Sequence, residues 1–374
     1  MLKSSCITFL SLLSALLFST SSYGDFSIVD ASNDDKGAGD ILYPANNRII
    51  EGELDLIKFE VKNTNDRHQL VFEFRKPLSS PKNQLSSFGG TSLSEILKHD
   101  FHTINVDVYI DTDRKINSGF KRILTGRQAL LANEFSWEKA IIITPRPYAS
   151  QSMHSDYLVK AKIEKLSNST ETLDSEITAK IEQEVKLEVK EHYLFATKIK
   201  IKKNKLIVTI PSSFISEFSD DWAYSVLISA ATTESSFNSS IDAPNFILLT
   251  QPGKNKNSLG LKAGARRNAS PIIDVLDSHG QQKEWLNNLL LNESTQRYFS
   301  VLGAIVPSQS KMKYSGTLTK PSVFSVPASQ SSNKEEVESL SMEDRLNRLK
   351  KLMDKKLISE EEYQNIRKKI IESL

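Results

Sequence analysis

An acidic, glycine-containing segment near the start of the chain has the residue types that hold a metal ion. Two glycines, Gly37 and Gly39, let the backbone bend between the oxygen-bearing side chains. Those side chains belong to Asp30, Asn33, Asp34, Asp35 and Asp40. Hard divalent cations take several oxygen ligands at about 2.3 to 2.6 Å, so the four aspartates are candidate ligands of a structural calcium ion. The alternative is a turn in which Asp and Asn bond their own backbone ahead of the first strand.

A second acidic turn is formed by Asp111 and Asp113, which follow a segment of alternating apolar and polar residues. Arg114 and Lys115 come directly after and supply positive charge of their own. An ion is therefore less expected at this turn than at the first.

Catalytic residues are not indicated anywhere in the sequence. The chain has no G-x-S-x-G, H-E-x-x-H, G-x-x-x-x-G-K-[ST] or G-x-G-x-x-G motif, so the common nucleophile, zinc and phosphate sites have no counterpart. Its six histidines are scattered. The single cysteine, Cys6, falls in a segment that we expect to be removed, which leaves no thiol for catalysis or disulfides. We expect a protein that is not an enzyme.

Two tryptophans, Trp137 and Trp222, are candidates for stacking on a sugar ring, because indole faces offer apolar area to the C–H face of a pyranose. Core packing is the competing interpretation. It is favoured for Trp222, which alternates with Tyr224, Val226 and Ile228 along an expected strand.

The first 24 residues have the features of a secretory signal peptide. Lys3 precedes an uncharged run from Ile7 to Phe18, and small residues come just before Asp25. We therefore expect an exported protein, either periplasmic or extracellular. No stretch of about 18 apolar residues occurs, so a stable membrane span is not expected. With 48 Lys+Arg against 46 Asp+Glu, the charge balance gives no reason to expect a nucleic-acid partner.

Residues 25–307 alternate with a period of two, as in β-strands that have one face buried. The clearest run is 103–110, and shorter runs occur at 70–74, 199–201, 208–210 and 222–228. Short strands between Asn, Gly, Pro and Ser clusters predict a mainly β fold, an antiparallel β-sandwich of immunoglobulin or jelly-roll type. A charged stretch at about 165–191 is expected to be an inserted surface helix or extended hairpin. Residues 308–340 have the composition of a flexible linker.

The final segment, 341–374, has the pattern of a helical hairpin, with a capping box at Ser359 and Glu362. It resembles the short C-terminal oligomerisation domain of bacterial proteins through the turn Lys356–Tyr363. Its apolar stripe is too small to form a core alone, which predicts homo-oligomerisation, with packing back on the sandwich as the alternative. The stripe consists of Leu346, Leu349, Met353, Tyr363, Ile366 and Ile370.

Four pieces of the β region resemble the DOMON-like domain at the C-terminus of glucodextranase. They are VDASNDDKGAGDILYP with EGELDLIKFEV, INVDVYIDTD, EFSWEKAIII, and RRNASPIIDVLDSHGQQKEWLNNLL with AIVP. The resemblance implies a β-sandwich without catalytic residues, related to carbohydrate-binding modules. It also implies a bound ion at a place comparable to the first acidic segment.

Two functions follow from these observations. The first is an exported module that binds carbohydrate or another small ligand and self-associates through its tail. The second is a periplasmic or envelope scaffold whose sandwich binds a protein partner. Self-association favours the scaffold, because a sugar binder gains only avidity from it.

Overall fold

The computed structural model describes residues 24–45, 49–64, 66–82, 97, 99–167, 175–231, 259–262, 270–292, 297–310 and 364. The chain divides into two compact units, Met1–Phe324 and Ser325–Leu374. Everything below concerns the first unit. The expected signal peptide up to Tyr23, the linker after Ser310 and the C-terminal hairpin apart from Gln364 lie outside the described residues.

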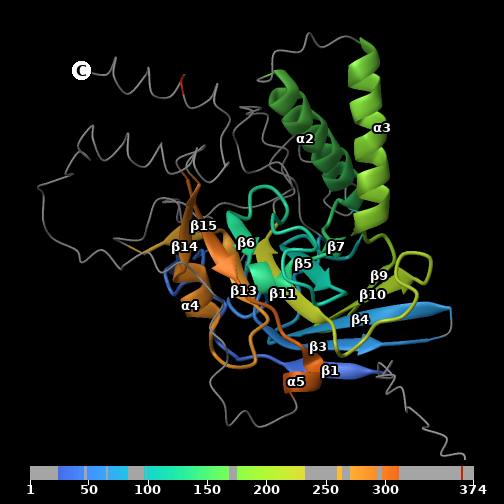
Figure 1. The fold of residues 1–374 in the computed structure, drawn as a ribbon. Helices are drawn as coiled ribbons and strands as arrows, with labels where there is room; N and C mark the ends of the chain where they lie inside the picture. The colour runs from blue at the N-terminus through green and yellow to red at the C-terminus, as the bar shows by residue number, and fades with distance from the viewer. Residues whose placement is uncertain are drawn as a thin grey trace, which may run out of the picture. The chain divides into compact units, whose positions relative to one another are not determined.

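Two five-stranded sheets form the body of the first unit (Figure 1). The order in the first sheet is β1 (Phe26–Val29), β3 (Leu56–Lys62), β4 (Arg67–Phe74), β10 (Lys205–Pro211) and β9 (Ile199–Lys202). The order in the second is β13 (Ile272–Val275), β11 (Ala223–Ala230), β5 (Ile104–Asp111), β7 (Lys139–Ile143) and β8 (Tyr193–Phe195). All neighbours are antiparallel except β7 and β8. The prediction of a mainly β fold is confirmed.

Aromatic side chains from both sheets meet in one core. The Tyr224 ring on β11 lies 5.9 Å from the ring of Phe59 on β3 and 5.1 Å from that of Phe26 on β1, measured between centroids. The alternating apolar residues of β4 are buried in the same cluster. Burial of each large apolar side chain contributes about 1.5 to 3 kcal/mol relative to exposure, so this core supplies the main stabilisation of the sheets.

Strand β5 is buried on both faces, and the prediction that only one face is buried was wrong. Its polar face carries Asp107, whose carboxylate binds the guanidinium of Arg127 at Nε–Oδ2 2.6 Å and Nη2–Oδ1 3.0 Å. Both side chains are buried. A bidentate pair satisfies a carboxylate away from water, which is why an alternating polar residue need not face solvent.

Two small sheets and three short helices complete the body. The sheets pair β2 (Ile41–Leu42) with β12 (Gly260–Leu261), and β15 (Arg297–Leu302) with β14 (Leu289–Asn292) and β6 (Ala129–Leu131). The helices are η1 (Asn133–Phe135), α4 (Gln282–Asn287) and α5 (Pro307–Ser310).

Two long helices, α2 (Pro147–Ser167) and α3 (Ser175–His192), connect the parallel strands β7 and β8 and extend away from the sheets (Figure 1). Parallel neighbours require a crossover connection, and here it takes the form of a helical hairpin. The predicted charged insertion at 165–191 coincides with α3, but the helical part begins earlier, at Pro147. Within the described part of the chain, no helix combines the length and apolarity needed to cross a membrane.

Candidate functional site

Three carboxylates converge where the loop after β1 meets the start of β3 and strand β13. One oxygen each of Asp34, Asp55 and Asp274 lies within 4.8 Å of the other two. Asp55 and Asp274 are fully buried and Asp34 is half-buried. Three acidic groups this close, with little water around them, repel one another strongly unless a positive charge lies between them.

We call Asp34, Asp55 and Asp274 the acidic cluster. Two more aspartates, Asp30 and Asp277, lie next to it. Asp30 Oδ1 accepts the backbone N–H of Asp277 at 2.8 Å and that of Ala31 at 2.9 Å. Burial, and then the charge of Asp34, raise the pKa of Asp30 to about 9. Burial, followed by the charges of Asp55 and Asp277, raises the pKa of Asp34 to about 6. The fold therefore gathers more negative charge here than an ion-free site tolerates near neutral pH.

Arg75 neutralises one side of the cluster. Its Nε donates to Asp55 Oδ2 at 2.5 Å, and its Nη2 lies 3.7 Å from Asp35 Oδ1. Gly52 makes room for this guanidinium: its φ is +97°, and a Cβ there would lie 2.8 Å from Arg75 Cζ. One guanidinium cannot balance all of these aspartates, so most of the negative charge stays uncompensated by side chains.

The free oxygens of the cluster suit a hard cation. Asp34 Oδ1, Asp55 Oδ1 and Asp30 Oδ2 are buried and accept no hydrogen bond within the described residues. Orphaned buried carboxylate oxygens are costly, and calcium takes six to eight oxygen ligands from carboxylates, carbonyl groups and waters. The Asp274 oxygens instead accept the backbone N–H groups of Leu56 and Val275, which fixes that carboxylate in position. The donor set therefore fits the calcium ion expected from the sequence.

The four predicted metal ligands, Asp30, Asp34, Asp35 and Asp40, do not all lie in the acidic cluster. Asp34 belongs to the cluster and Asp30 borders it. Asp35 is buried, but its Oδ2 accepts the Tyr43 hydroxyl at 2.6 Å and the Gly52 N–H at 2.8 Å, a structural role. Asp40 is not part of a metal-type group among the described residues. Its backbone oxygen accepts the N–H of Lys262 instead.

Sequence reasoning missed Asp55 and Asp274, which lie far from the acidic loop in the chain. The available signal was an acid inside an apolar run, as in Ile272–Leu276, where a buried strand holds a charge that needs a partner. Such a signal marks a buried carboxylate without saying what it faces.

The second acidic turn gathers Asp111, Asp113 and Glu138, but neighbouring groups of the chain already bind its oxygens. Asp111 Oδ1 accepts the Arg114 N–H at 2.7 Å, and Asp113 Oδ1 accepts the Lys115 N–H at 2.9 Å. The two cationic side chains lie 3.5 and 3.4 Å from the same carboxylates. Two of the three carboxylates in this turn are therefore paired with cationic side chains.

The two candidate tryptophans differ in exposure. Trp137 is 0% exposed; its Nε1 donates to the Arg122 carbonyl, and its ring packs against Tyr109, Phe120 and Tyr193. That burial does not match the expectation that Trp137 stacks on a sugar, because neither ring face is open. Trp222 is only half-buried and lies beside Phe218, with 6.4 Å between ring centroids.

A polar hollow of about 460 Å³ lies beside His68, whose ring is 5.4 Å from that of Phe218. The hollow is lined by Gly24, Asp25, Asn63, Thr64, His68, Ser216 and Glu217. His68 Nε2 lies 2.9 Å from the Ser216 carbonyl oxygen, and a carbonyl only accepts hydrogen bonds. Nε2 therefore donates this hydrogen bond, and Nδ1 is buried without a hydrogen-bond partner among the described residues.

The mainly β fold thus carries two features that could hold a ligand, the acidic cluster and the polar hollow. A family model described as the C-terminal, SLH-like binding module of glucodextranase matches residues 26–302, more than half of the chain. The chain therefore belongs to this family. The family is a binding module and not a catalytic domain, as the sequence resemblance implied. No curated protein matches the chain.

Proposed function

We propose that this chain is an exported, non-catalytic module that binds carbohydrate. The observation that carries the proposal is membership, over residues 26–302, of a family described as a binding module of glucodextranase. An enzyme named for glucodextran acts on a polymeric glucan, and a binding module attached to such an enzyme would hold that polymer. Chains of glucose units are accordingly the proposed ligand class.

The sugar site that we propose combines Trp222 with the polar hollow. Sugar hydroxyls need both donors and acceptors, while the C–H faces of the ring need apolar area. The hollow offers the carboxylates of Asp25 and Glu217 and the hydroxyl group of the exposed Thr64. The half-exposed Trp222 offers apolar area nearby, because both the hollow and this ring adjoin Phe218.

Calcium is proposed as a structural ion of this module, held by Asp34, Asp55 and Asp274 with Asp30 beside them. The ion would supply the positive charge that Arg75 alone cannot. It would tie the loop after β1 to β3 and β13. Asp25 precedes β1 and Asp30 follows it, so an ion at one end of this strand would help to fix the hollow at the other end.

Three further features of the proposal follow the sequence analysis. The two sheets would form an immunoglobulin- or jelly-roll-like sandwich, with aromatic contacts between them in support. Export, to the periplasm or beyond the cell, suits a module of a polysaccharide-degrading enzyme. The C-terminal segment 341–374 would make the protein multivalent, which raises avidity on a polymer that carries many copies of the ligand.

Electrophoresis through gels that contain glucodextran tests both the function and the site. The mature protein is expected to be retarded, and Trp222→Ala and Glu217→Ala are each expected to lose most of the retardation. Tyr298→Ala is the control, because this side chain is exposed and lies on β15. Equal retardation of all variants would overturn the site alone. Free migration of the unaltered protein would contradict carbohydrate binding.

A further inference from the structure

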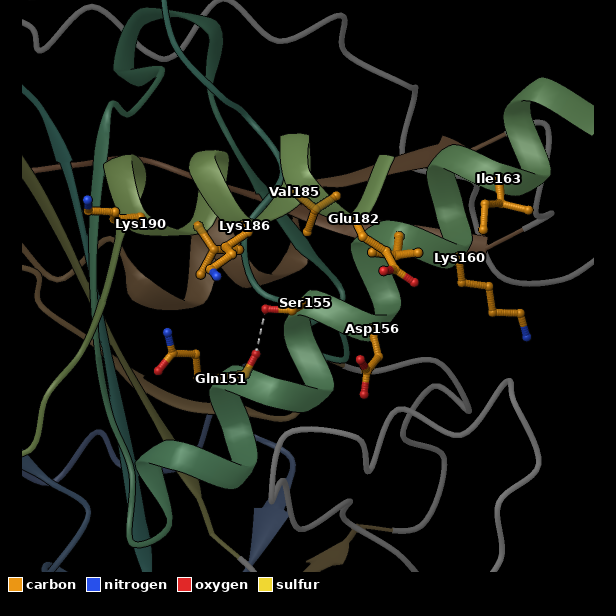
Figure 2. Close-up of a pocket in the computed structure, with 11 residues that line it drawn as sticks. Gln151, Ser155, Asp156, Lys160, Ile163, Glu182, Val185, Lys186 and Lys190 are labelled. Atoms are coloured by element: carbon orange, nitrogen blue, oxygen red, sulfur yellow. Dashed lines mark hydrogen bonds between the residues drawn. The ribbon is translucent and has the colours of Figure 1, made fainter. Parts of the chain in front are cut away.

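The helical hairpin carries an open groove between α2 and α3 (Figure 2). Its volume is about 690 Å³. The walls run from Gln151 to Ile163 on α2 and from Glu182 to Lys190 on α3. At 1.5 Å of rise per residue the α2 wall is about 18 Å long, which corresponds to three turns of another helix.

The floor of the groove is aliphatic. Val185 and Val189 of α3 are buried against α2, whereas Val159 and Ile163 of α2 are only half-buried. The pairing of two helices therefore leaves aliphatic surface that a third element could cover. None of the residues that line the groove is aromatic, so its walls are poorly suited to sugar rings.

Unpaired positive charge lies along one wall. Lys186 and Lys190 are exposed, one helical turn apart, and neither forms an ion pair with a described residue. Figure 2 shows both on α3, with the uncharged Gln151 on the facing helix. The Ser155 hydroxyl near them donates to the Gln151 carbonyl at 3.0 Å and brings no negative charge.

The lysine end of the groove contrasts with the rest of the hairpin. Outside the groove, Lys162 of α2 and Glu188 of α3 form an ion pair between the helices at 2.9 Å. The acidic residue of the α3 wall, Glu182, lies near Lys160 at the end away from Lys190 (Figure 2). A ligand that lies along the whole groove thus meets aliphatic surface, the carboxylates of Asp156 and Glu182, and two ammonium groups without an ion-pair partner at the Lys190 end.

We propose that this groove binds an acidic amphipathic helix of a partner protein. Its aliphatic side chains would pack on Val159 and Ile163, completing a three-helix arrangement. Its carboxylates would pair with Lys186 and Lys190, which gives orientation and specificity. The proposal does not depend on sugar binding, because the hairpin extends away from the sheets that carry the polar hollow.

Fluorescence anisotropy of labelled peptides with the mature full-length protein tests this proposal. The probes are a Leu/Glu amphipathic peptide of about 18 residues, its counterpart with Lys in place of Glu, and a scrambled Leu/Glu peptide. The variant K186E/K190E reverses the charge of the groove. The matched control, K165E/K180E, makes the same change on exposed lysines that do not line the groove.

The unaltered protein and the control are expected to bind the Leu/Glu peptide at least tenfold more tightly than the other two. K186E/K190E is expected to reverse that preference toward the Leu/Lys peptide, which no misfolded variant would do. The proposal is overturned if the unaltered protein does not prefer the Leu/Glu peptide. Equal weakening by K165E/K180E and K186E/K190E would also overturn it.

Discussion

An oxygen of Asp34, in the loop after the first strand, lies within 4.8 Å of an oxygen of Asp274, in a strand near the end of the β region. Two segments that are far apart in the sequence thus lie next to each other here, and each carries a carboxylate. Asp55, which lies between them in the sequence, adds a third carboxylate. Like charges this close repel one another, so the proposed cation would stabilise the fold at this point.

Removal of divalent ions should therefore lower the melting temperature of the mature protein, and calcium should restore it. A ligand present at about 100 times its Kd stabilises the folded state by about 2.7 kcal/mol. Thermal melts with EDTA and with calcium measure the difference, which Asp34→Ala is expected to abolish. Asp113→Ala, in the acidic turn that Lys115 neutralises, should keep it. Superimposable melts under both conditions would reject the ion.

Loss of one partner of the buried ion pair Arg127–Asp107 should destabilise the fold more than loss of both partners. Arg127→Met leaves Asp107 as an uncompensated buried charge, which typically costs about 3 to 5 kcal/mol. The double variant Arg127→Met with Asp107→Leu should recover much of that loss. Urea unfolding measures each free energy.

A surface pair gives the control for this experiment. Lys205 Nζ lies 2.9 Å from Glu73 Oε2, and both side chains are partly exposed, so Lys205→Met should change stability by no more than about 1 kcal/mol. Similar losses for Lys205→Met and Arg127→Met would contradict the assigned role of the buried pair.

His154 should make the stability depend on pH. Burial, and then the positive charge of Arg127, lower the pKa of His154 to about 4, below its usual 6.5. The unfolded chain therefore binds a proton that the folded chain does not between pH 6.5 and 4. Stability from this group is complete above pH 6.5 and falls toward pH 4. At about 1.4 kcal/mol per pKa unit the loss is at most about 3 kcal/mol.

His154→Phe should flatten this part of the stability curve, because it removes the titrating group. Phe is chosen because the rings of Tyr193 and Phe195 lie next to His154. Urea midpoints at several pH values between 4 and 7 measure the effect relative to the unaltered protein. The exposed His279→Phe serves as control. If His154→Phe follows the same curve as the unaltered protein, the assigned titration is incorrect.

The alternation of apolar residues was enough to predict strands β4, β5, β9, β10 and β11. Leu70, Phe72 and Phe74 fall on β4, and the run 103–110 falls on β5 within one residue. Helix α2 was not predicted from Pro147, because its first ten residues contain only Tyr148 and Met153 as large apolar side chains. Helix α2 belongs instead to the connection between the parallel strands β7 and β8. The pairing of these two strands is a long-range property that the local sequence does not show.

The residues of the candidate site also differ in whether the sequence could predict them. Asp34 was predicted because acidic residues and glycines surround it in the sequence. Asp55 and Asp274 were not, since only the pairing of strands brings them to the loop. The sequence favoured core packing for Trp222 and left Trp137 open, but the fold encloses Trp137 among other rings and leaves Trp222 half-buried.

Deletion of residues 334–374 should convert the protein from an oligomer to a monomer. The apolar stripe from Leu346 to Ile370 would bury several side chains on association, each worth about 1.5 to 3 kcal/mol before ordering costs. Light scattering gives the mass of both forms. An unchanged mass after deletion would count against the tail as an assembly device.

A glycan array probed with the mature protein, with calcium present, tests carbohydrate binding most directly. The account predicts signals on glucodextran fragments and other chains of glucose units, and loss of those signals in Trp222→Ala. An array without signal on any glycan, from protein whose melting curve shows that it is folded, would contradict it.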